Sequence, residues 1–432
     1  MKKGFTIFLL LLFIIVQSFG QETDLSVLKT FEGIYQDASG LKYIVNPTDG
    51  FPHFTIMGSG ETHMLRNKAT NVFEFSSTRN GWNTIGGTIE FRSEDDGYIM
   101  CLSFKDKKQN CAKAISFNSQ ELSLTIDDTL FISGDLIQPI NPKNNLVAVL
   151  LHGDRENDRY DLFDIGMYLV SEGYSVFAFD KRNAGKSKGS EVEGNGYDEI
   201  SRVYASDAVK LISRLKNDYP EKQFGVVGIS QGGWIGSIVA SEIPDLSFYV
   251  NIAGSISIGW KQWRHYMISY LKRSGFSSND IIEAEDYFES FFDVGLQRTT
   301  FEQYSTKLLQ YQLKDWFKKL EKKKLIEWND ESSAIKVVAR NSNDPSLDVK
   351  SVKAPTLGIF YEFDHSTPPD SPSIFLNSLL LSNAKDVSVR VFPNTTHGGW
   401  VVDSYYFNTA KITKMESKAC YFIIDWLDSI KQ

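Results

Sequence analysis

The chain has 432 residues, of which 42% are hydrophobic and 23% are charged, a composition typical of globular proteins and of a length that suggests two or three domains. Its formal net charge of −8 argues against nucleic acid as a partner. Only three cysteines are present, which excludes a fold held together by a disulfide framework.

Residues 1–20 have the pattern of a secretory signal peptide. Two lysines precede an unbroken apolar run at 7–16, and small or polar residues follow up to Gly20. A run of this length is short for a bilayer span, so we expect cleavage after Gly20 and no stable membrane insertion afterwards. The protein is therefore expected to be periplasmic or secreted, with a net charge of −10 once the lysines are removed.

Residues 21–128 alternate short apolar runs with Gly, Asn and Asp, which predicts a small antiparallel β domain. Cys101 and Cys111 flank a polar stretch typical of a hairpin tip, so a disulfide and two free thiols are equally open. His53 and His63 have no acid or cysteine at ligand spacing, and we expect surface histidines rather than a metal site.

The pattern changes in residues 129–432, where near-continuous apolar strands alternate with helical segments. Runs such as "NLVAVLL" and "YSVFAFD" are typical of strands that are buried on both faces, which predicts an α/β fold with a mostly parallel sheet covered by helices. The last helical pattern contains Cys420, which we expect to be a packed core residue.

The strand signal disappears between about 260 and 343, and apolar residues recur there at helical spacing. This predicts a helical insertion, which is a candidate lid. We expect most of its aromatic residues to form its own core and a minority to line an acyl pocket. The tryptophans concerned are Trp260, Trp263, Trp316 and Trp328.

Two stretches spell G-x-S-x-G, the pattern of a turn that exposes a nucleophilic serine: "GKSKG" around Ser187 and "GISQG" around Ser230. Ser230 follows a buried strand and precedes a helix-forming run, which is the strand–turn–helix setting that this chemistry needs. Ser187 lies in a polar, glycine-rich loop with no apolar strand directly before it. Ser230 is therefore the nucleophile candidate.

A serine nucleophile needs a base and an acid that orients the base. His397 and Asp364 each come just after a buried strand, and the chain order Ser230, Asp364, His397 is the one expected on this kind of sheet. His265 lies in the helical insertion and is expected to be an ordinary interior or surface histidine. The acids that compete with Asp364 are Asp344, Asp348, Asp370, Asp386 and Glu362, each placed less favourably relative to the strands.

Two backbone N–H groups are candidates for an oxyanion hole, those of Asp154 and Gln231. "HGD" at 152–154 follows an earlier strand, and its glycine allows the backbone turn that aims an N–H at the substrate oxygen. His152 precedes the nucleophile, and we expect it to hold this loop in shape rather than to act as the base.

With these residues in place, the chain from about 130 to its end resembles the α/β-hydrolase superfamily. It is most similar to secreted bacterial esterases related to dienelactone hydrolases and prolyl-oligopeptidase-type peptidases, on five ordered motifs: "LLHGDREND", "FDKRNAGKSKG", "GISQGG", "EFDHSTPP" and "PNTTHGGW". The resemblance implies triad roles for Ser230, Asp364 and His397. Asn183 departs from the usual glycine of the second motif, and Asp154 would disfavour anionic substrates if its carboxylate faced the site.

These observations predict a serine hydrolase that cleaves small carboxylic esters through an acyl-enzyme, with no cofactor and no metal. A serine peptidase is the first alternative, because the same triad cleaves amides. A non-catalytic binding protein on the same fold is the second. The ester, the oligomeric state and the role of the β domain stay open.

Overall fold

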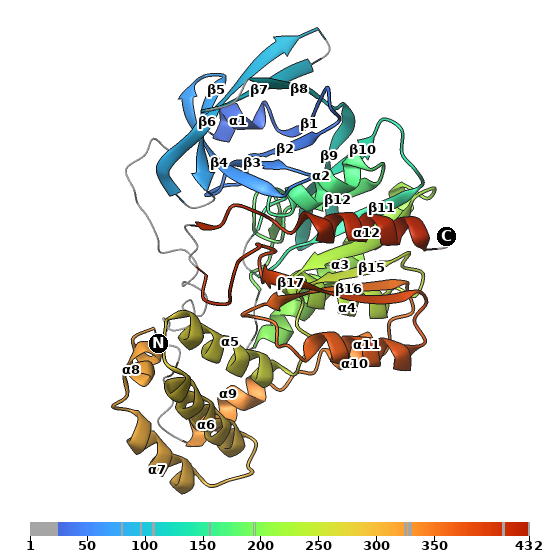
Figure 1. Cartoon of the computed structure of the whole chain (residues 1–432). Helices are drawn as coiled ribbons and strands as arrows, with labels where there is room; N and C mark the ends of the chain where they lie inside the picture. The colour runs from blue at the N-terminus through green and yellow to red at the C-terminus, as the bar shows by residue number, and fades with distance from the viewer. Residues whose placement is uncertain are drawn as a thin grey trace.

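A computed structural model describes residues 25–430 except 79–80, 96, 106–108, 155–156, 193, 195, 324–325, 327–330 and 408–410. The expected signal peptide and Trp328 lie outside the described residues. Within the described part of the chain, no helix is long and apolar enough to cross a membrane. The strands form a closed antiparallel barrel and a larger, mostly parallel sheet, drawn at the top and in the middle of Figure 1.

The barrel follows a short helix, α1 (Leu25–Lys29), and closes because its first strand pairs with its last. Alternate side chains point inward and build an aromatic core that includes Phe54, Phe73 and Phe75. The strands are β1 (Gly33–Asp37), β2 (Lys42–Asn46), β3 (His53–Ile56), β4 (Glu61–Ala69), β5 (Val72–Thr78), β6 (Gly81–Glu94), β7 (Gly97–Phe104) and β8 (Asn110–Ala114).

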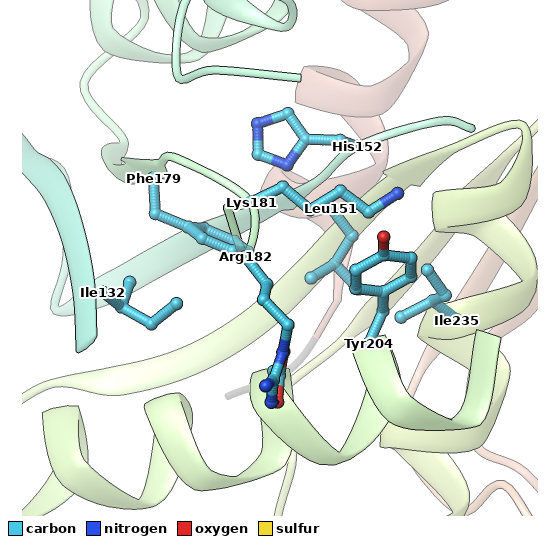
Figure 2. A pocket seen from close by; sticks show the side chains of 9 residues that line it. Ile132, Leu151, His152, Phe179, Lys181, Arg182, Tyr204 and Ile235 are labelled. Atoms are coloured by element: carbon cyan, nitrogen blue, oxygen red, sulfur yellow. The ribbon is translucent and has the colours of Figure 1, made fainter. Parts of the chain in front are cut away.

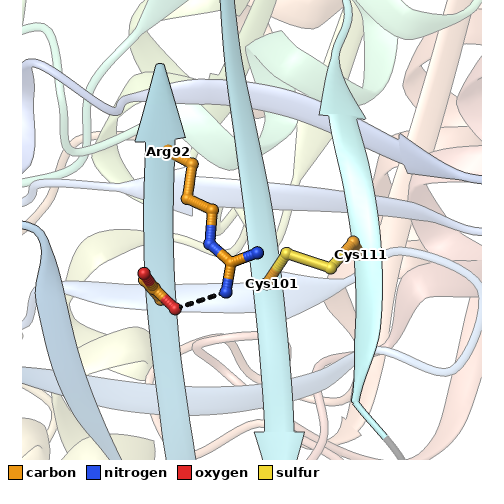
Figure 3. Close-up of a disulfide and its surroundings, with 4 residues drawn as sticks. Arg92, Cys101 and Cys111 are labelled. Carbon is orange, nitrogen blue, oxygen red and sulfur yellow. Dashed lines mark hydrogen bonds and ion pairs between the residues drawn. A yellow bond between two sulfur atoms is a disulfide. The ribbon is translucent and has the colours of Figure 1, made fainter. Parts of the chain in front are cut away.

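Cys101 on β7 and Cys111 on β8 are directly opposite each other and form a disulfide (Figure 3). The sequence left a disulfide and two free thiols equally open for this pair, and the structure contains the disulfide. Cys420 is the free cysteine, and it is buried as expected.

The expectation of two surface histidines is wrong. His53 is 5% exposed and His63 is 7% exposed. His53 is buried because its Nε2 lies 2.9 Å from a carboxylate oxygen of Asp164, on a helix of the other sheet. His63 stacks on Phe54 inside the barrel. Among the described residues, no group of His, Cys, Asp or Glu is arranged to hold a metal ion.

The larger sheet has the strand order β13-β10-β12-β11-β14-β15-β16-β17, with β9 paired to the outside of β10. All neighbours from β12 to β17 are parallel, and β11 and β12 are buried along their whole length, as their continuous apolar runs predict. The strands are β9 (Phe117–Asp127), β10 (Leu130–Pro139), β11 (Leu146–Leu151), β12 (Ser175–Phe179), β13 (Lys188–Gly189), β14 (Gln223–Ile229), β15 (Tyr249–Ile252), β16 (Thr356–Phe363) and β17 (Val387–Thr396).

Strand β9 falls within the range 21–128 in which we expected the N-terminal β domain, but it pairs with β10 over ten residues and so extends the larger sheet. Its alternating pattern resembles that of the barrel strands, because an antiparallel strand at the margin of a sheet also has one buried and one exposed face.

Helices cover both faces of the larger sheet, which gives the α/β-hydrolase fold predicted from the sequence. One face packs against α2 (Phe163–Ser171) and α12 (Ser417–Ser429). The other packs against α3 (Tyr197–Asp218), α4 (Gln231–Glu242), α10 (Ser346–Val349) and α11 (Ser371–Ser382).

Between β15 and β16, the part of the chain that precedes α10 is helical (Figure 1). These helices have a separate hydrophobic core. Trp316 is completely buried in this core, and Trp260 and Trp263 pack into it. The helices are α5 (Gly259–Arg273), α6 (Ser278–Gly295), α7 (Phe301–Tyr311), α8 (Asp315–Lys322) and α9 (Glu331–Arg340).

Candidate active site

Ser230 lies on a sharp turn between β14 and α4. Its φ is 55° and its ψ is −120°, a conformation that a non-glycine residue adopts only when its surroundings enforce it. The Ser230 N–H donates to the carbonyl of Ile252 on the neighbouring strand, and its carbonyl accepts from the N–H of Gly233. These bonds hold the serine above the carboxyl end of the sheet.

The two glycines of the motif are required by close backbone approaches. A Cβ at Gly228 would lie 2.0 Å from the carbonyl oxygen of Gly232, and a Cβ at Gly232 would lie 2.0 Å from that of Leu151. Any side chain at either position would therefore push the strand, the turn and the helix apart.

The structure brings Ser230, His397 and Asp364 together in one chain of hydrogen bonds. His397 Nε2 lies 2.8 Å from Ser230 Oγ, and His397 Nδ1 lies 2.9 and 2.8 Å from the two carboxylate oxygens of Asp364. The three residues follow β14, β17 and β16, so a parallel sheet delivers all of them to the same edge. We call this arrangement the triad.

Asp364 is buried, at 4% exposure, yet it is stabilised as an anion. Burial alone raises the pKa of a carboxyl group, but the interaction with His397 and the hydrogen bond from the N–H of Thr367 outweigh it, so the pKa of Asp364 is lowered. The N–H groups of Ser366 and Thr367 both donate to Oδ1 at 2.7 Å. The acid is thus ionised and fixed in orientation.

The competing acids have other partners. Asp348 pairs with Arg202, Asp370 accepts from Ser257, Asp344 accepts from the N–H of Ser346, and Glu362 accepts from the N–H of Asn394. Asp386 lies in the turn before β17, at the opposite end of that strand from His397.

Ser187 is completely buried, and its hydrogen bonds are made to the backbone rather than to the triad. Its hydroxyl donates to the carbonyl of Asp180 and accepts from the N–H of Ser133, which ties the loop after β12 to β10. Asn183 in the same loop has a φ of 63°, a conformation that asparagine tolerates better than most residues, which explains how it replaces the usual glycine.

The segment 152–154 lies against Ser230, since a Cβ at Gly153 would be 3.5 Å from the Cβ of Ser230. Gln231 is the first residue of α4, so its N–H has no partner within the helix. His152 is buried, and its ring packs edge-on against Phe179, as expected for a residue that shapes the loop.

Lys181 is a residue of the site that the sequence reasoning missed. Its Nζ donates to the carbonyl of Gly153 at 2.9 Å and to Oε1 of Gln231 at 3.1 Å, so it joins the two segments with the candidate oxyanion groups. Burial lowers its pKa to about 8, while the nearby carboxylate of Asp154 acts in the opposite direction. The sequence signal that could have identified Lys181 is its position directly after the buried strand β12, which pairs with β11.

Figure 2 shows Lys181 beside a small internal cavity, together with His152 and Tyr204. The cavity has a volume of about 20 Å³, which is enough for one water molecule and too small for a substrate. The amine also lies 3.9 Å from the centre of the Tyr204 ring, a favourable cation–π contact. Of these residues, Lys181 contacts both segments that carry the candidate oxyanion groups.

Helix α5 contributes polar groups on the other side of the triad. His265 Nε2 lies 2.9 Å from the carbonyl oxygen of Asp364. Arg273, two turns further along, interacts electrostatically with Asp364, and its Nε is buried without a hydrogen-bond partner among the described residues. The ring of His365, 6% exposed, lies 5.6 Å from that of His397, and burial lowers its pKa to about 3, so it is neutral.

Comparison with known proteins agrees with this architecture. A family model described as serine aminopeptidase, S33, matches residues 142–398, more than half of the chain. No curated protein sequence matches significantly.

The solved structures similar to this chain include three enzymes of low identity. An esterase from Pyrococcus furiosus is 18% identical, with 73% of this chain and 92% of that chain covered and a TM-score of 0.46. A proline iminopeptidase from Mycobacterium smegmatis is 17% identical (65% and 92% covered, TM-score 0.42). A dienelactone hydrolase from Anabaena variabilis is 12% identical (73% and 99% covered, TM-score 0.40). On the strength of the family match, this chain is a hydrolase with the α/β-hydrolase fold and belongs to the serine aminopeptidase (S33) family.

Proposed function

We propose that this protein is a serine hydrolase that cleaves carboxylic esters through an acyl-enzyme intermediate, with Ser230 as nucleophile, His397 as base and Asp364 as the orienting acid. The observation that carries the proposal is the unbroken hydrogen-bond chain from Ser230 Oγ through the imidazole to the buried carboxylate. No role of this kind follows for Ser187, whose hydroxyl is engaged in the loop.

In this reaction Ser230 Oγ attacks the ester carbonyl carbon while His397 Nε2 accepts the hydroxyl proton. The imidazolium is stabilised by Asp364, whose lowered pKa keeps it ionised. The tetrahedral intermediate then expels the alcohol, which takes the proton from Nε2. A water molecule repeats the same steps on the acyl-enzyme, and the carboxylic acid leaves with Ser230 regenerated.

The N–H groups of Asp154 and Gln231 are proposed to stabilise the oxyanion. The contact of segment 152–154 with Ser230 supports this assignment. Lys181 supports it too, since it holds Gly153 and the Gln231 side chain in one geometry. Loss of one oxyanion donor costs about 3–4 kcal/mol of transition-state stabilisation, so a residue that fixes both donors affects the rate strongly.

A peptidase that removes N-terminal residues is the second candidate, favoured by the description of the matching family. Such an enzyme must accommodate the positively charged amino group of its substrate. Arg273 on α5 interacts electrostatically with Asp364, and a cation on this side of the triad is unfavourable for a substrate ammonium group. The carboxylate of Asp154 interacts with Lys181. The charge of Arg273 therefore favours substrates without a free amino group, such as simple esters.

Two further assignments complete the proposal. The helical insertion, residues 260–343, acts as a lid, because its first helix contacts the acid loop of the triad through His265. The protein works in the periplasm or outside the cell, where a disulfide such as Cys101–Cys111 persists.

The test is labelling with a fluorophosphonate probe together with a substrate screen. Wild type should be labelled and should hydrolyse p-nitrophenyl esters faster than aminoacyl p-nitroanilides. Ser230→Ala should lose both labelling and hydrolysis, and Ser187→Ala should keep its rate within a few-fold. Faster cleavage of the anilides would replace the esterase assignment by the peptidase, and labelling of Ser230→Ala would remove Ser230 from its role.

A further inference from the structure

The N-terminal barrel lies outside residues 142–398, the part matched by the family, and so has no function assigned through it. We propose that the barrel positions His397, by means of a continuous ladder of backbone pairs between the barrel and the loop that carries this histidine. The inference rests on the proposed function for its catalytic consequence, but its structural part can be measured independently.

His397 lies at the tip of a short hairpin, residues 394–402, which we call the histidine hairpin. The Thr396 N–H donates to the carbonyl of Trp400 at 2.9 Å, and the Val402 N–H donates to the carbonyl of Asn394 at 2.8 Å. Two glycines follow the histidine, and Gly399 has a φ of 73°. Glycine lowers the cost of this tight turn but also leaves it conformationally permissive, so the hairpin needs support from its neighbours.

The return strand of the hairpin pairs with a second segment, residues 413–416, which we call the bridging segment. The Val401 N–H donates to the carbonyl of Lys414 at 3.0 Å, and the Glu416 N–H donates to the carbonyl of Gly399 at 2.7 Å. This pairing adds a third strand beside the histidine hairpin.

The bridging segment in turn pairs with the barrel, at the turn between β3 and β4. The Met415 N–H donates to the carbonyl of Gly60 at 2.7 Å, and the Thr62 N–H donates to the carbonyl of Thr413 at 2.9 Å. Glu61 and Lys414 are directly opposite each other in this antiparallel bridge. The ladder therefore runs without interruption from the barrel to the residue that precedes His397, and Figure 1 shows the C-terminal chain passing along the barrel.

The barrel can serve as a support because it is fixed to the larger sheet at a separate place. Asp164 on α2 accepts hydrogen bonds from Asn46 at 3.0 Å and from Thr55 at 3.2 Å, and it lies 2.9 Å from His53. The Tyr168 hydroxyl, also on α2, donates to the carbonyl of Met57 at 2.8 Å. The barrel thus spans from α2 to the bridging segment.

A side-chain contact reinforces the ladder. The ring of Phe51, in the loop between β2 and β3, meets the ring of Trp400 edge-on, with centroids 6.1 Å apart. Trp400 belongs to the return strand of the histidine hairpin, three residues after His397. A displacement of about 1 Å of a catalytic group can cost a hundredfold in rate, so a support of this kind bears on kcat.

Gly60 provides a sharp test, because a Cβ there would lie 2.1 Å from the carbonyl oxygen of Met415. Gly40 is the matched control. It lies in another hairpin turn of the same barrel with a similar positive φ of 89°, against 72° for Gly60, and a Cβ there meets only the end of the Gln36 side chain, at 3.7 Å. Alanine at either position carries a comparable backbone strain, but only Gly60→Ala forces the barrel and the bridging segment apart.

We expect Gly60→Ala to lower kcat about 10- to 100-fold with KM changed less than about threefold, and Gly40→Ala to leave kcat within about twofold. Amide hydrogen exchange should show faster exchange at Met415, Val401 and Thr396 in Gly60→Ala alone. If the exchange accelerates at Met415 while kcat and the exchange at Thr396 stay at the wild-type level, the barrel does not position the histidine.

Phe51→Leu covers the case in which Gly60→Ala does not fold. It removes the ring contacts with Trp400 and His53 and leaves the backbone ladder intact. We expect a three- to tenfold loss of kcat, whereas Phe51→Tyr, which keeps the ring, should retain the wild-type kcat. An unchanged kcat in a folded Phe51→Leu variant would count against the support. Should the wild type hydrolyse no ester, the rate of amide exchange at Thr396 in the Gly60 and Gly40 variants still decides whether the barrel holds the hairpin.

Discussion

Replacing Asp364 by asparagine tests the role of the acid in the triad. The structure fixes how the new amide must lie. Oδ1 accepts from the N–H groups of Ser366 and Thr367, both at 2.7 Å, so the amide oxygen has to take this position. The amide nitrogen then replaces Oδ2, the nearer of the two oxygens to His397 Nδ1, at 2.8 Å against 2.9 Å for Oδ1.

An amide nitrogen is a donor, so it can pair with Nδ1 only if that ring nitrogen carries no proton. The proton of the neutral imidazole then moves to Nε2, which can no longer accept the proton of Ser230. Loss of the correct tautomer and of the charge that stabilises the imidazolium lowers kcat by about 10⁴-fold in a serine triad. This corresponds to about 5.4 kcal/mol in activation free energy.

The assay is steady-state hydrolysis of a p-nitrophenyl ester, with the rate of fluorophosphonate labelling as a second measure and circular dichroism as a check on folding. Asp370→Asn is the control, because this carboxylate accepts from Ser257 and an amide oxygen can replace it there. We expect its rate to stay within about twofold. An Asp364→Asn variant that retains more than about a tenth of the wild-type rate would show that the orienting acid lies elsewhere.

Three more outcomes follow from single contacts. Burial lowers the pKa of Lys181 to about 8, so the amine loses its charge as the pH rises through this value and kcat/KM should fall on the alkaline side. Lys181→Met should be slower and should lack this alkaline fall. A pH–rate profile measures both, and an alkaline fall that persists in Lys181→Met refutes the assignment. Ser187→Ala should lower the free energy of unfolding by about 1–3 kcal/mol, because two buried backbone groups lose their partner, and an unchanged urea midpoint would contradict this. Reduction of Cys101–Cys111, which closes a separation of 10 residues, should lower the free energy of unfolding by about 2.7 kcal/mol, and no change of Tm with dithiothreitol in a thermal melt would rule this out.

The residues of the site that could be predicted from the sequence are those whose position is indicated by a local sequence pattern. Ser230, Asp364 and His397 each follow a buried strand, and strands of a parallel sheet end at one edge, so their meeting could be inferred from chain order. The same reasoning applied to "HGD" after β11. Lys181 also follows a buried strand, but a lysine there has no catalytic pattern to distinguish it from a surface residue.

What could not be predicted depends on partners that are distant in the sequence. His53 is buried because it pairs with Asp164 on α2, a helix that packs on the larger sheet, and no residue near His53 in the sequence indicates this carboxylate. Strand β9 shows the same alternation as a barrel strand, and only its pairing with β10 decides to which sheet it belongs. The sequence of the bridging segment has no strand-like alternation of apolar and polar residues. Its extended pairing depends on the two neighbouring segments to which its backbone is hydrogen-bonded.

The pairing of Gly60 with Met415 joins segments about 350 residues apart in the sequence. During synthesis from the N-terminus, at about 5–20 residues per second, the barrel therefore emerges well before its partner segment. When Ser230, Asp364 and His397 have been made, the hairpin that carries the proposed base still lacks its pairing partner. We therefore expect hydrolytic activity to arise only after residues 413–416 have been made and have paired with the barrel.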